Sequence, residues 1–291
     1  MPVAQVNNPQ MKDILDSEFQ RSSDPSFMAR IAVSKYLNLP GVRGFWGPAV
    51  KLGAQGGINA TDMTGGTNHL AWAVNPLFYS QLGRLAWSFD GATQYASNPD
   101  QPQWDITAAE VWAGYPGLSL GAWVYTTRAR PYAGNEAIIS KWSFAANNWS
   151  YLLEFETLNN NNLTLALSST GANQFFFDHS KTIAANKWYF VAATYNPGAV
   201  LGEAAGVRIW VNDTLQYHAA TDRGVAGLPA SIFSGTANLE VGSLGGGNNF
   251  FQGFQTNWFI CGNYLLEGEI FSIWETTKYL MGYMNEFGTS W

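Results

Sequence analysis

The chain is poor in charged residues, in cysteine and in long apolar runs. Only 12% of its 291 residues are charged, against a typical share of about 25%, so Asn, Gln, Ser, Thr and Gly must supply much of the polar surface. Cys261 is the only cysteine, which excludes an intrachain disulfide and favours a small buried core residue over a nucleophile. No apolar run has the length of a transmembrane helix.

A secretory signal is also missing from the N-terminus. Residues 1–20 contain neither a basic start nor an apolar stretch of about 7 to 15 residues. Because a surface of uncharged polar residues is typical of extracellular proteins, we expect the protein to reach the outside by cell lysis or by assembly into a particle.

Basic residues are few and scattered, whereas aromatic residues are abundant. The formal net charge is −6, with 15 Lys and Arg, and nucleic-acid binding needs a basic face that releases phosphate counterions. We therefore exclude nucleic acid as the main ligand. Aromatic residues make up 15% of the chain and include 13 Trp. Each large ring buries on the order of 150 to 250 Å², so a substantial packed core is available.

The beginning of the chain has a helical pattern. Asp24 and Pro25 are typical of a helix start, and the apolar residues within 27–32 follow at helical spacing. A weaker helix is predicted within residues 11–20. Pro40 ends the pattern, so this segment predicts a helical N-terminal arm.

From Gly44 onward the hydrophobic pattern changes to a period of two. In residues 117–126, GLSLGAWVYT, the apolar side chains at even positions share one face, while Trp123 and Tyr125 lie on the other. Further strands are predicted at AIISKW, SYLLEFE, NLTLALSS, KWYFVAATY, GVRIWVNDTL and NLEVGS. Asn212 and Asp213 are suited to a tight hairpin turn because both residue types tolerate positive φ.

Many short strands separated by polar turns predict an all-β fold, a two-sheet antiparallel jelly-roll sandwich. Residues 1–40 are the predicted arm, and residues 41–291 are the sandwich domain. Residues 266–281 return to helical spacing and predict a closing helical turn.

Several motifs, in order, resemble the laminin-G-like or concanavalin-like jelly rolls. They are LAWSFDGATQYA, GLSLGAWVY, AIISK, KWYFVAATYN, VRIWVNDTL and the closing segment FQGFQTNWFICGNYLLEGEIFSIW. The resemblance covers residues 44–281 and implies the sandwich fold. It implies function only weakly, since this superfold hosts lectins, adhesins, hydrolases and structural proteins.

The order of elements is also similar to that of laminin-G-like structural proteins of bacteriophages. This resemblance implies a virion surface protein, either a capsid decoration or a head-associated subunit. Residues 1–40 would dock on the major capsid protein or another virion protein, and exposed aromatic loops favour a homo-oligomer. The alternative is a secreted or cell-surface carbohydrate-binding lectin or adhesin, and glycan binding is compatible with both hypotheses.

A glycoside hydrolase is the third hypothesis. Glucanases of this sandwich class place their catalytic carboxylates on one strand as Glu-x-Asp-x-x-Glu. Glu154 matches the first position, and Glu156 stands at the second position in place of Asp. Asn159 stands at the acid/base position and cannot donate a proton. We therefore predict no enzymatic activity, and we expect the two glutamates to lie on a solvated outer strand face.

Calcium is the one cofactor that the resemblance would add. Asp90, in the FDG turn, matches a position that binds calcium at the rim of some family members. Asn257 stands where an acidic residue is usual, so we expect no cofactor and a turn-stabilising Asp90 side chain, with calcium as the alternative. His69, His179 and His218 lack zinc-ligand spacing.

Aromatic residues near loops are the candidate ligand contacts. We expect Trp123, Trp188 and Trp210 to pack within the sandwich, because they alternate with apolar residues on strands. Apolar side chains near loops usually signal contact with a partner, and this applies to the groups 175–177 and 250–251. The candidate ligand-binding residues are Trp142, Trp149, Phe176, Asn248 and Phe250.

Overall fold

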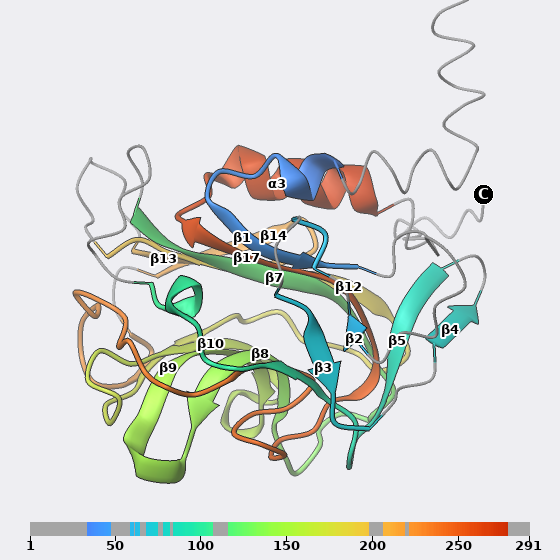
Figure 1. Cartoon of the computed structure of the whole chain (residues 1–291), viewed down its shortest axis with the longest axis horizontal. Helices are drawn as coiled ribbons and strands as arrows, with labels where there is room; N and C mark the ends of the chain where they lie inside the picture. The colour runs from blue at the N-terminus through green and yellow to red at the C-terminus, as the bar shows by residue number, and fades with distance from the viewer. Residues whose placement is uncertain are drawn as a thin grey trace, which may run out of the picture.

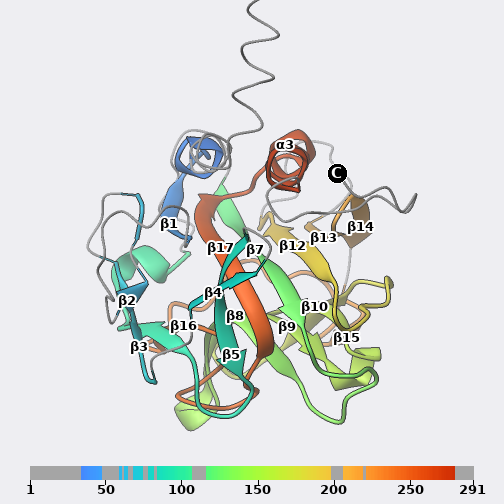
Figure 2. The ribbon, with the colours of Figure 1, turned by 90° about the vertical axis from the view of Figure 1, so that its right-hand side faces the viewer.

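The computed structural model describes residues 34–47, 59–60, 62–64, 68–74, 78–81, 84–106, 116–197, 206–218 and 221–278. Within these residues, two antiparallel β-sheets pack face to face, and a short helical layer covers the outside of one of them (Figures 1 and 2). The predicted two-sheet sandwich is confirmed.

The first sheet has the strand order β14, β13, β12, β7, β17, β5, β4, and β1 also pairs with β17. Its strands are β1 (Val42–Trp46), β4 (Phe78–Gln81), β5 (Arg84–Asp90), β7 (Pro116–Thr126), β12 (Trp188–Tyr195), β13 (Val207–Val211), β14 (Thr214–His218) and β17 (Gln252–Asn263).

The second sheet has the order β15, β11, β10, β9, β8, β16, β6, β3, β2. Its strands are β2 (Asn59–Ala60), β3 (Leu70–Trp72), β6 (Ala96–Asn98), β8 (Glu136–Ser143), β9 (Asn148–Glu156), β10 (Asn162–Leu167), β11 (Phe175–Asp178), β15 (Arg223–Gly224) and β16 (Leu239–Val241). Short 3-10 helices lie at Pro102–Trp104, Ala145–Asn147 and Thr157–Asn159.

The main core lies between the two sheets and follows from the alternation in the sequence. On β7, Leu118, Leu120, Ala122 and Val124 point inward and are fully buried. They meet inward-facing residues of the second sheet, among them Leu163 and Leu165 on β10 and Leu153 and Phe155 on β9. The alternation on β7 therefore predicts the burial correctly.

A helical layer covers the outer face of the first sheet. Helix α3 (Glu267–Thr277) lies beside the helical residues 34–37 in both views (Figures 1 and 2), and the ammonium group of Lys35 donates a hydrogen bond to Ser272 at 3.0 Å. The predicted closing helix is thus confirmed within residues 267–277. No helix in the described part of the chain is long and apolar enough to span a membrane.

The layer buries the tryptophans and the cysteine that alternation assigns to the outer face. Trp123, Trp210 and Cys261 are buried beneath it, and Trp188 packs against the same cluster. The indole N–H of Trp123 donates to Thr277 Oγ1 at 2.8 Å. Their predicted packing role is therefore confirmed.

Much of the predicted arm, including the helices proposed within residues 11–20 and after Asp24, lies outside the described residues. The last part of the arm packs on its own sandwich: Tyr36 is fully buried and stacks on Phe45 with ring centroids 4.2 Å apart, and Leu39 lies in the same cluster. The division at residue 40 stays a prediction, but residues 34–40 contribute to the fold of the sandwich.

The hairpin turn predicted at Asn212 and Asp213 is confirmed. Val211 pairs with Thr214, so Asn212 and Asp213 form the two-residue turn between β13 and β14. Asn212 has a φ of +57°, a conformation that Asn tolerates better than most residues.

Candidate functional site

A separate apolar cluster lies on the outer face of the second sheet, opposite to the core. Most residues of this cluster lie on β8, β9, β10 and β11 and point away from the first sheet, whereas Leu244 reaches the cluster from the loop after β16. The cluster consists of Ala137, Trp142, Leu152, Ala166 and Leu244, with Trp149 and Phe176 packed against it. Leu152 on β9 faces Ala166 on β10, which faces Phe176 on β11, so the cluster crosses three neighbouring strands.

One end of this cluster is a group of stacked aromatic rings at the hairpin between β8 and β9. The rings of Trp142 and Trp149 are parallel within 5°, with centroids 5.4 Å apart. Phe144, in the turn, meets Trp149 edge-on at 6.3 Å, and 55% of it is exposed. We call Trp142, Phe144 and Trp149 the aromatic platform.

The platform contains polar atoms that are buried but not paired. Neither the indole N–H of Trp142 nor that of Trp149 has a hydrogen-bond partner in the described structure, and the same holds for the hydroxyl of the adjacent Ser150. Unpaired buried donors cost about 1 to 3 kcal/mol each and are uncommon in native proteins. A ligand or water that carries acceptor oxygens would remove this cost.

Charged side chains lie beside the apolar cluster on the same sheet face. Arg223, on β15, donates to both carboxylate oxygens of Glu156, from Nη1 at 3.2 Å and from Nη2. Its Nε donates to Asp178 Oδ2 at 2.7 Å, and its guanidinium lies 4.7 Å from the ring centre of Phe176. The hydrogen bonds to Asp178 and Glu156 raise the pKa of Arg223, so Arg223 holds these side chains as one ionic group.

Glu154 is the buried neighbour of this ionic group. Its carboxyl accepts hydrogen bonds from Asn135 Nδ2 at 3.2 Å and from Asn249 Nδ2 at 3.3 Å. Burial raises the pKa of Glu154 to about 8, and the nearby charge of Glu156 adds to this shift. At neutral pH Glu154 is therefore mainly a neutral acid.

The expectation that Glu154 and Glu156 lie on a solvated strand face is wrong. Both side chains do lie on the outer face, but only 2% and 5% of these residues are exposed. The reason is that Asn135, Asn249 and Arg223 cover them. Asn135 directly precedes β8, but Asn249 and Arg223 come from segments far from β9 in sequence.

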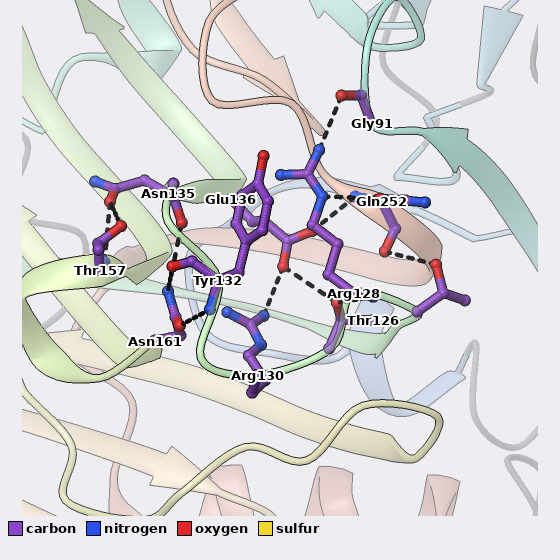
Figure 3. A network of polar contacts seen from close by, with 12 residues as sticks. Gly91, Thr126, Arg128, Arg130, Tyr132, Asn135, Glu136, Thr157, Asn161 and Gln252 are labelled. Atoms are coloured by element: carbon purple, nitrogen blue, oxygen red, sulfur yellow. Dashed lines mark hydrogen bonds and ion pairs between the residues drawn. The ribbon is translucent and has the colours of Figure 1, made fainter.

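The loop between β7 and β8 is fixed by the polar network in Figure 3. The carboxylate of the fully buried Glu136 accepts from Arg130 Nη2 at 2.6 Å and from the backbone N–H of Gln252 at 2.9 Å. Arg128 Nη2 donates to the Gly91 carbonyl at 2.9 Å. Burial raises the pKa of Glu136, and the two arginines oppose that shift.

The same network positions the Asn135 side chain (Figure 3). Its Oδ1 accepts from the backbone N–H and the hydroxyl of Thr157 at 3.0 and 2.9 Å. Asn161 closes the loop from the other side, because its Oδ1 accepts from Tyr132 N at 2.5 Å and its Nδ2 donates to Tyr132 O at 3.0 Å. The Nδ2 of Asn135 is thereby directed to Glu154.

The geometry offers a binding surface more readily than a hydrolytic centre. The acid/base position of the hydrolase pattern, Asn159, lies in the 3-10 helix Thr157–Asn159 and not on β9. Glu156 is tied to Arg223, and Glu154 is mainly protonated at neutral pH. The groups of this sheet face that are left for interaction with a partner are the stacked rings of Trp142 and Trp149 and their unpaired indole N–H groups.

The structure brings together some of the candidate ligand residues predicted from the sequence. Trp142, Trp149 and Phe176 belong to one cluster. Asn248 and Phe250 lie in the adjacent loop, where Asn248 exchanges backbone hydrogen bonds with Leu244 at 2.9 and 3.0 Å.

Phe250 packs near Tyr95 at 6.1 Å. The expectation of exposure is wrong for Phe175, Phe177 and Phe251, which lie in the main core. It is also wrong for Trp142, of which only 2% is exposed, because the outer cluster covers it. Strand alternation on β11 puts Phe175 and Phe177 inward and leaves Phe176 outside.

Sequence reasoning missed Phe144, Ser150 and Arg223. An apolar residue in a polar hairpin turn is a usable signal for Phe144. No local signal identifies Arg223, because it reaches the site through the pairing of the short strand β15 with β11, where Arg223 faces Phe176.

Asp90 has the predicted turn-stabilising role. Its carboxylate accepts from the backbone N–H groups of Ala92, Thr93 and Gln94 and from the hydroxyl of Thr93, at 2.5 to 3.0 Å. Although partial burial opposes the shift, these bonds lower the pKa of Asp90 to about 2. The expectation of no cofactor, with calcium as the alternative, stays a prediction. The described residues contain no group of three or more His, Cys, Asp or Glu that could hold a metal.

Known proteins support the assignment of the fold. Residues 90–256 match the Concanavalin A-like lectin/glucanases superfamily, and this is more than half of the chain. No curated protein sequence matches the chain.

Several solved structures share the fold. A structure of botulinum neurotoxin type C, whose cell entry depends on interaction with two ganglioside molecules, has a TM-score of 0.56 at 11% identity and covers 84% of this chain and 52% of that one. The binding domain of botulinum neurotoxin DC in complex with rat synaptotagmin II has a TM-score of 0.54 at 13% identity, with coverage of 82% and 52%.

The ligand binding domain of botulinum neurotoxin serotype D, in complex with N-acetylneuraminic acid, has a TM-score of 0.52 at 14% identity, with coverage of 84% and 52%. The chain thus spans about half the length of these structures, and identities this low relate the fold alone. The family match has a broader consequence: the chain belongs to the concanavalin A-like lectin/glucanases superfamily.

Proposed function

We propose that the chain is a non-enzymatic glycan-binding module and that the aromatic platform is its contact surface. The observation that carries this proposal is the stacked pair of Trp142 and Trp149, with an exposed Phe144 at its edge and unpaired indole N–H groups within it. The lectin-like fold and the ligands named for similar structures, gangliosides and N-acetylneuraminic acid, support the same class of ligand.

Sugar rings and aromatic rings are complementary in two ways. A pyranose has an apolar face of C–H groups that covers an aromatic ring, and its hydroxyl oxygens accept hydrogen bonds from indole N–H groups. Phe144, which is 55% exposed, and the half-buried Trp149 supply the stacking contact. The two indole N–H groups are buried, so they donate to a ligand only after the side chains that cover them move. The surrounding carboxyl and amide groups of Glu154, Glu156 and Asn135 add hydrogen-bonding groups that fix orientation, as is usual in small-molecule sites.

The setting that we propose for this module is the virion surface. A capsid decoration or head-associated subunit would attach through residues 1–40 to the major capsid protein or another virion protein and would act as a homo-oligomer. The resemblance in the order of elements to laminin-G-like structural proteins of bacteriophages supports this setting over a secreted or cell-surface lectin. Mass spectrometry of purified particles tests it, and absence of the chain from those particles would favour the lectin alternative.

The binding proposal is tested with a saccharide panel. The panel contains glucose, galactose, mannose, N-acetylglucosamine, lactose, maltose, cellobiose and N-acetylneuraminic acid. We expect Phe144→Ala and Trp149→Ala to weaken binding about tenfold, the effect of about 1.4 kcal/mol of lost stacking.

The control variant is Phe271→Ala, since Phe271 is 46% exposed on α3, on the other side of the molecule. We expect Phe271→Ala to bind like the unchanged protein. If all three variants bound every saccharide of the panel equally well, the platform would not be the contact surface.

A further inference from the structure

The loop of residues 242–251, between β16 and β17, folds back over the outer face of the second sheet. Ser140 Oγ on β8 donates to the Ser243 carbonyl at 2.9 Å, and the Ala137 amide donates to the Asn249 carbonyl at 2.8 Å. The loop therefore runs along β8, next to the platform. Phe251 lies in the main core and its N–H donates to the Gly242 carbonyl at 2.9 Å, so these two residues form the base of the loop. We call residues 243–250 the cover loop.

One apolar side chain of the cover loop is inserted into the outer cluster. Leu244 is fully buried in contact with the group that contains Trp142, Leu152 and Ala166. Trp142 belongs both to the platform and to this cluster, so the platform adjoins the surface that Leu244 covers.

Polar groups of the cover loop pair with buried carboxyls on either side of Leu244. Glu240 accepts from Ser243 Oγ at 2.6 Å and from the Gly246 amide at 2.8 Å. Glu154 accepts from Asn249 Nδ2 at 3.3 Å. Burial raises the pKa of both carboxyls. The hydrogen bonds from the loop lower these pKa values and satisfy carboxyl oxygens that would otherwise be buried without a donor.

The cover loop thus presents an apolar group flanked by hydrogen-bond donors, the same combination that a sugar ring presents with its C–H face and its hydroxyls. We propose that the cover loop occupies a second saccharide subsite, with Leu244 in the place of a sugar ring, and that it moves aside when a disaccharide extends from the platform. This inference rests on the proposed glycan binding and adds the length of ligand that the site accepts.

Two further observations fit a loop that exchanges with a ligand. The indole N–H of Trp142 is buried without a partner in the described structure while the loop is in place, so the closed arrangement leaves a donor unused. The tip of the loop faces open space, because a Cβ added at Gly246 would meet no atom within 4 Å. Gly245, Gly246 and Gly247 have φ values of +57°, +78° and +115°, which glycine adopts without steric cost.

The experiment locks the cover loop with a disulfide. A Cβ built on Gly245 lies 3.3 Å from Ser143 Cα and 3.6 Å from Ser143 Oγ, so cysteine side chains at these two positions lie within reach of each other. The φ of +57° at Gly245 strains any side chain there, and the single Gly245→Cys variant measures that effect. The variant carries Ser143→Cys together with Gly245→Cys. The native Cys261 is fully buried in the helical layer and does not compete.

Binding of the saccharide panel is measured by calorimetry on the oxidised and reduced forms of this variant. We expect the oxidised form to bind disaccharides about tenfold more weakly than the reduced form, because locking removes the open state from the population. Monosaccharide binding at the platform should be the same in both forms. The single variants, which cannot form the bond, should not respond to reduction.

A second variant tests the same proposal without a disulfide, in case the double variant does not fold. Leu244→Ala removes the inserted side chain and should tighten disaccharide binding about tenfold through a larger open fraction. Its matched control is Leu265→Ala, because Leu265 is equally buried but lies in the helical layer.

The outcomes separate the two proposals. Equal disaccharide binding by the locked, reduced and Leu244→Ala forms would overturn the second subsite and leave glycan binding at the platform intact. No binding of any saccharide by any form would overturn glycan binding and the subsite together.

Discussion

At the scale of single residues, burial of charge on the outer face of the second sheet controls the protonation of Glu154. The side chain is almost completely buried and lies near Glu156, and burial is the larger cause of its raised pKa. Arg223 is shared between Glu156 and Asp178, so it does not compensate a charge on Glu154 fully. Protonation therefore stabilises the folded chain at this position.

Glu154 gives a pH dependence of stability on the alkaline side. Its pKa is about 8 in the folded chain and about 4.5 when unfolded, so its contribution is complete below the unfolded pKa and is lost as the pH rises toward 8. We expect the free energy of unfolding to fall by on the order of a few kcal/mol between pH 5 and pH 9. Urea unfolding at several pH values measures this. The same fall in Glu154→Gln would contradict the assignment.

His179 acts in the opposite direction on the acid side. Its Nδ1 accepts from the Lys181 amide at 2.9 Å, so Nε2 carries the proton directed to the Thr214 carbonyl. Burial lowers the pKa of His179 to about 4. The neutral ring contributes stability that is complete above the unfolded pKa of about 6.5 and is lost as the pH falls toward 4. We expect His179→Gln to show a smaller loss of stability between pH 7 and pH 4 in the same urea series, and an unchanged acid response would reject this role.

At the scale of elements, the helical layer joins the two ends of the described chain on one face of the sandwich. Tyr36 stacks on Phe45, and both lie in one cluster with Ile270 and Ile273 of α3. Residues 34–40 therefore stabilise the sandwich, whatever residues 1–33 do.

Two truncations separate stability from attachment. Removal of residues 1–40 should lower the free energy of unfolding by on the order of 3 to 5 kcal/mol, because the buried contacts of Tyr36 and Leu39 are lost. Removal of residues 1–33 retains both side chains and should change stability little. Under the proposed virion setting, the shorter truncation should still lose incorporation into particles. Thermal unfolding and particle assembly measure the two effects, and normal incorporation of the shorter truncation would contradict a docking role for the arm.

The elements also show how far the sequence could predict the fold and the site. Alternation identifies β7 and the inward positions of β9 because sheet burial has a period of two. The turn at Asn212 is a local signal and is found equally well. Loop placement is not local: the cover of Glu154 by Asn249, and the arrival of Arg223 beside Phe176, depend on pairings between distant segments. The Glu154 and Glu156 pair is therefore recognisable in the sequence, but its burial is not predictable from it.

At the scale of the whole molecule, the structural and the proposed functional surfaces are on opposite sides. The helical layer covers the outer face of the first sheet (Figure 1), and the platform lies on the outer face of the second sheet. One face of the sandwich is thus covered by the chain's own helical layer, and the opposite face carries the surface that we propose for the ligand.

The central claim, glycan contact at the aromatic platform, is tested most directly by the indole N–H signals in a nitrogen-15 NMR titration with the saccharide panel. Trp142 and Trp149 have unpaired N–H groups, whereas the N–H of Trp123 donates to Thr277 on the other side of the molecule. We predict that saccharides shift the signals of Trp142 and Trp149 and leave that of Trp123 unchanged. Binding that leaves the signals of Trp142 and Trp149 in place, or absence of any shift across the panel, would contradict the account.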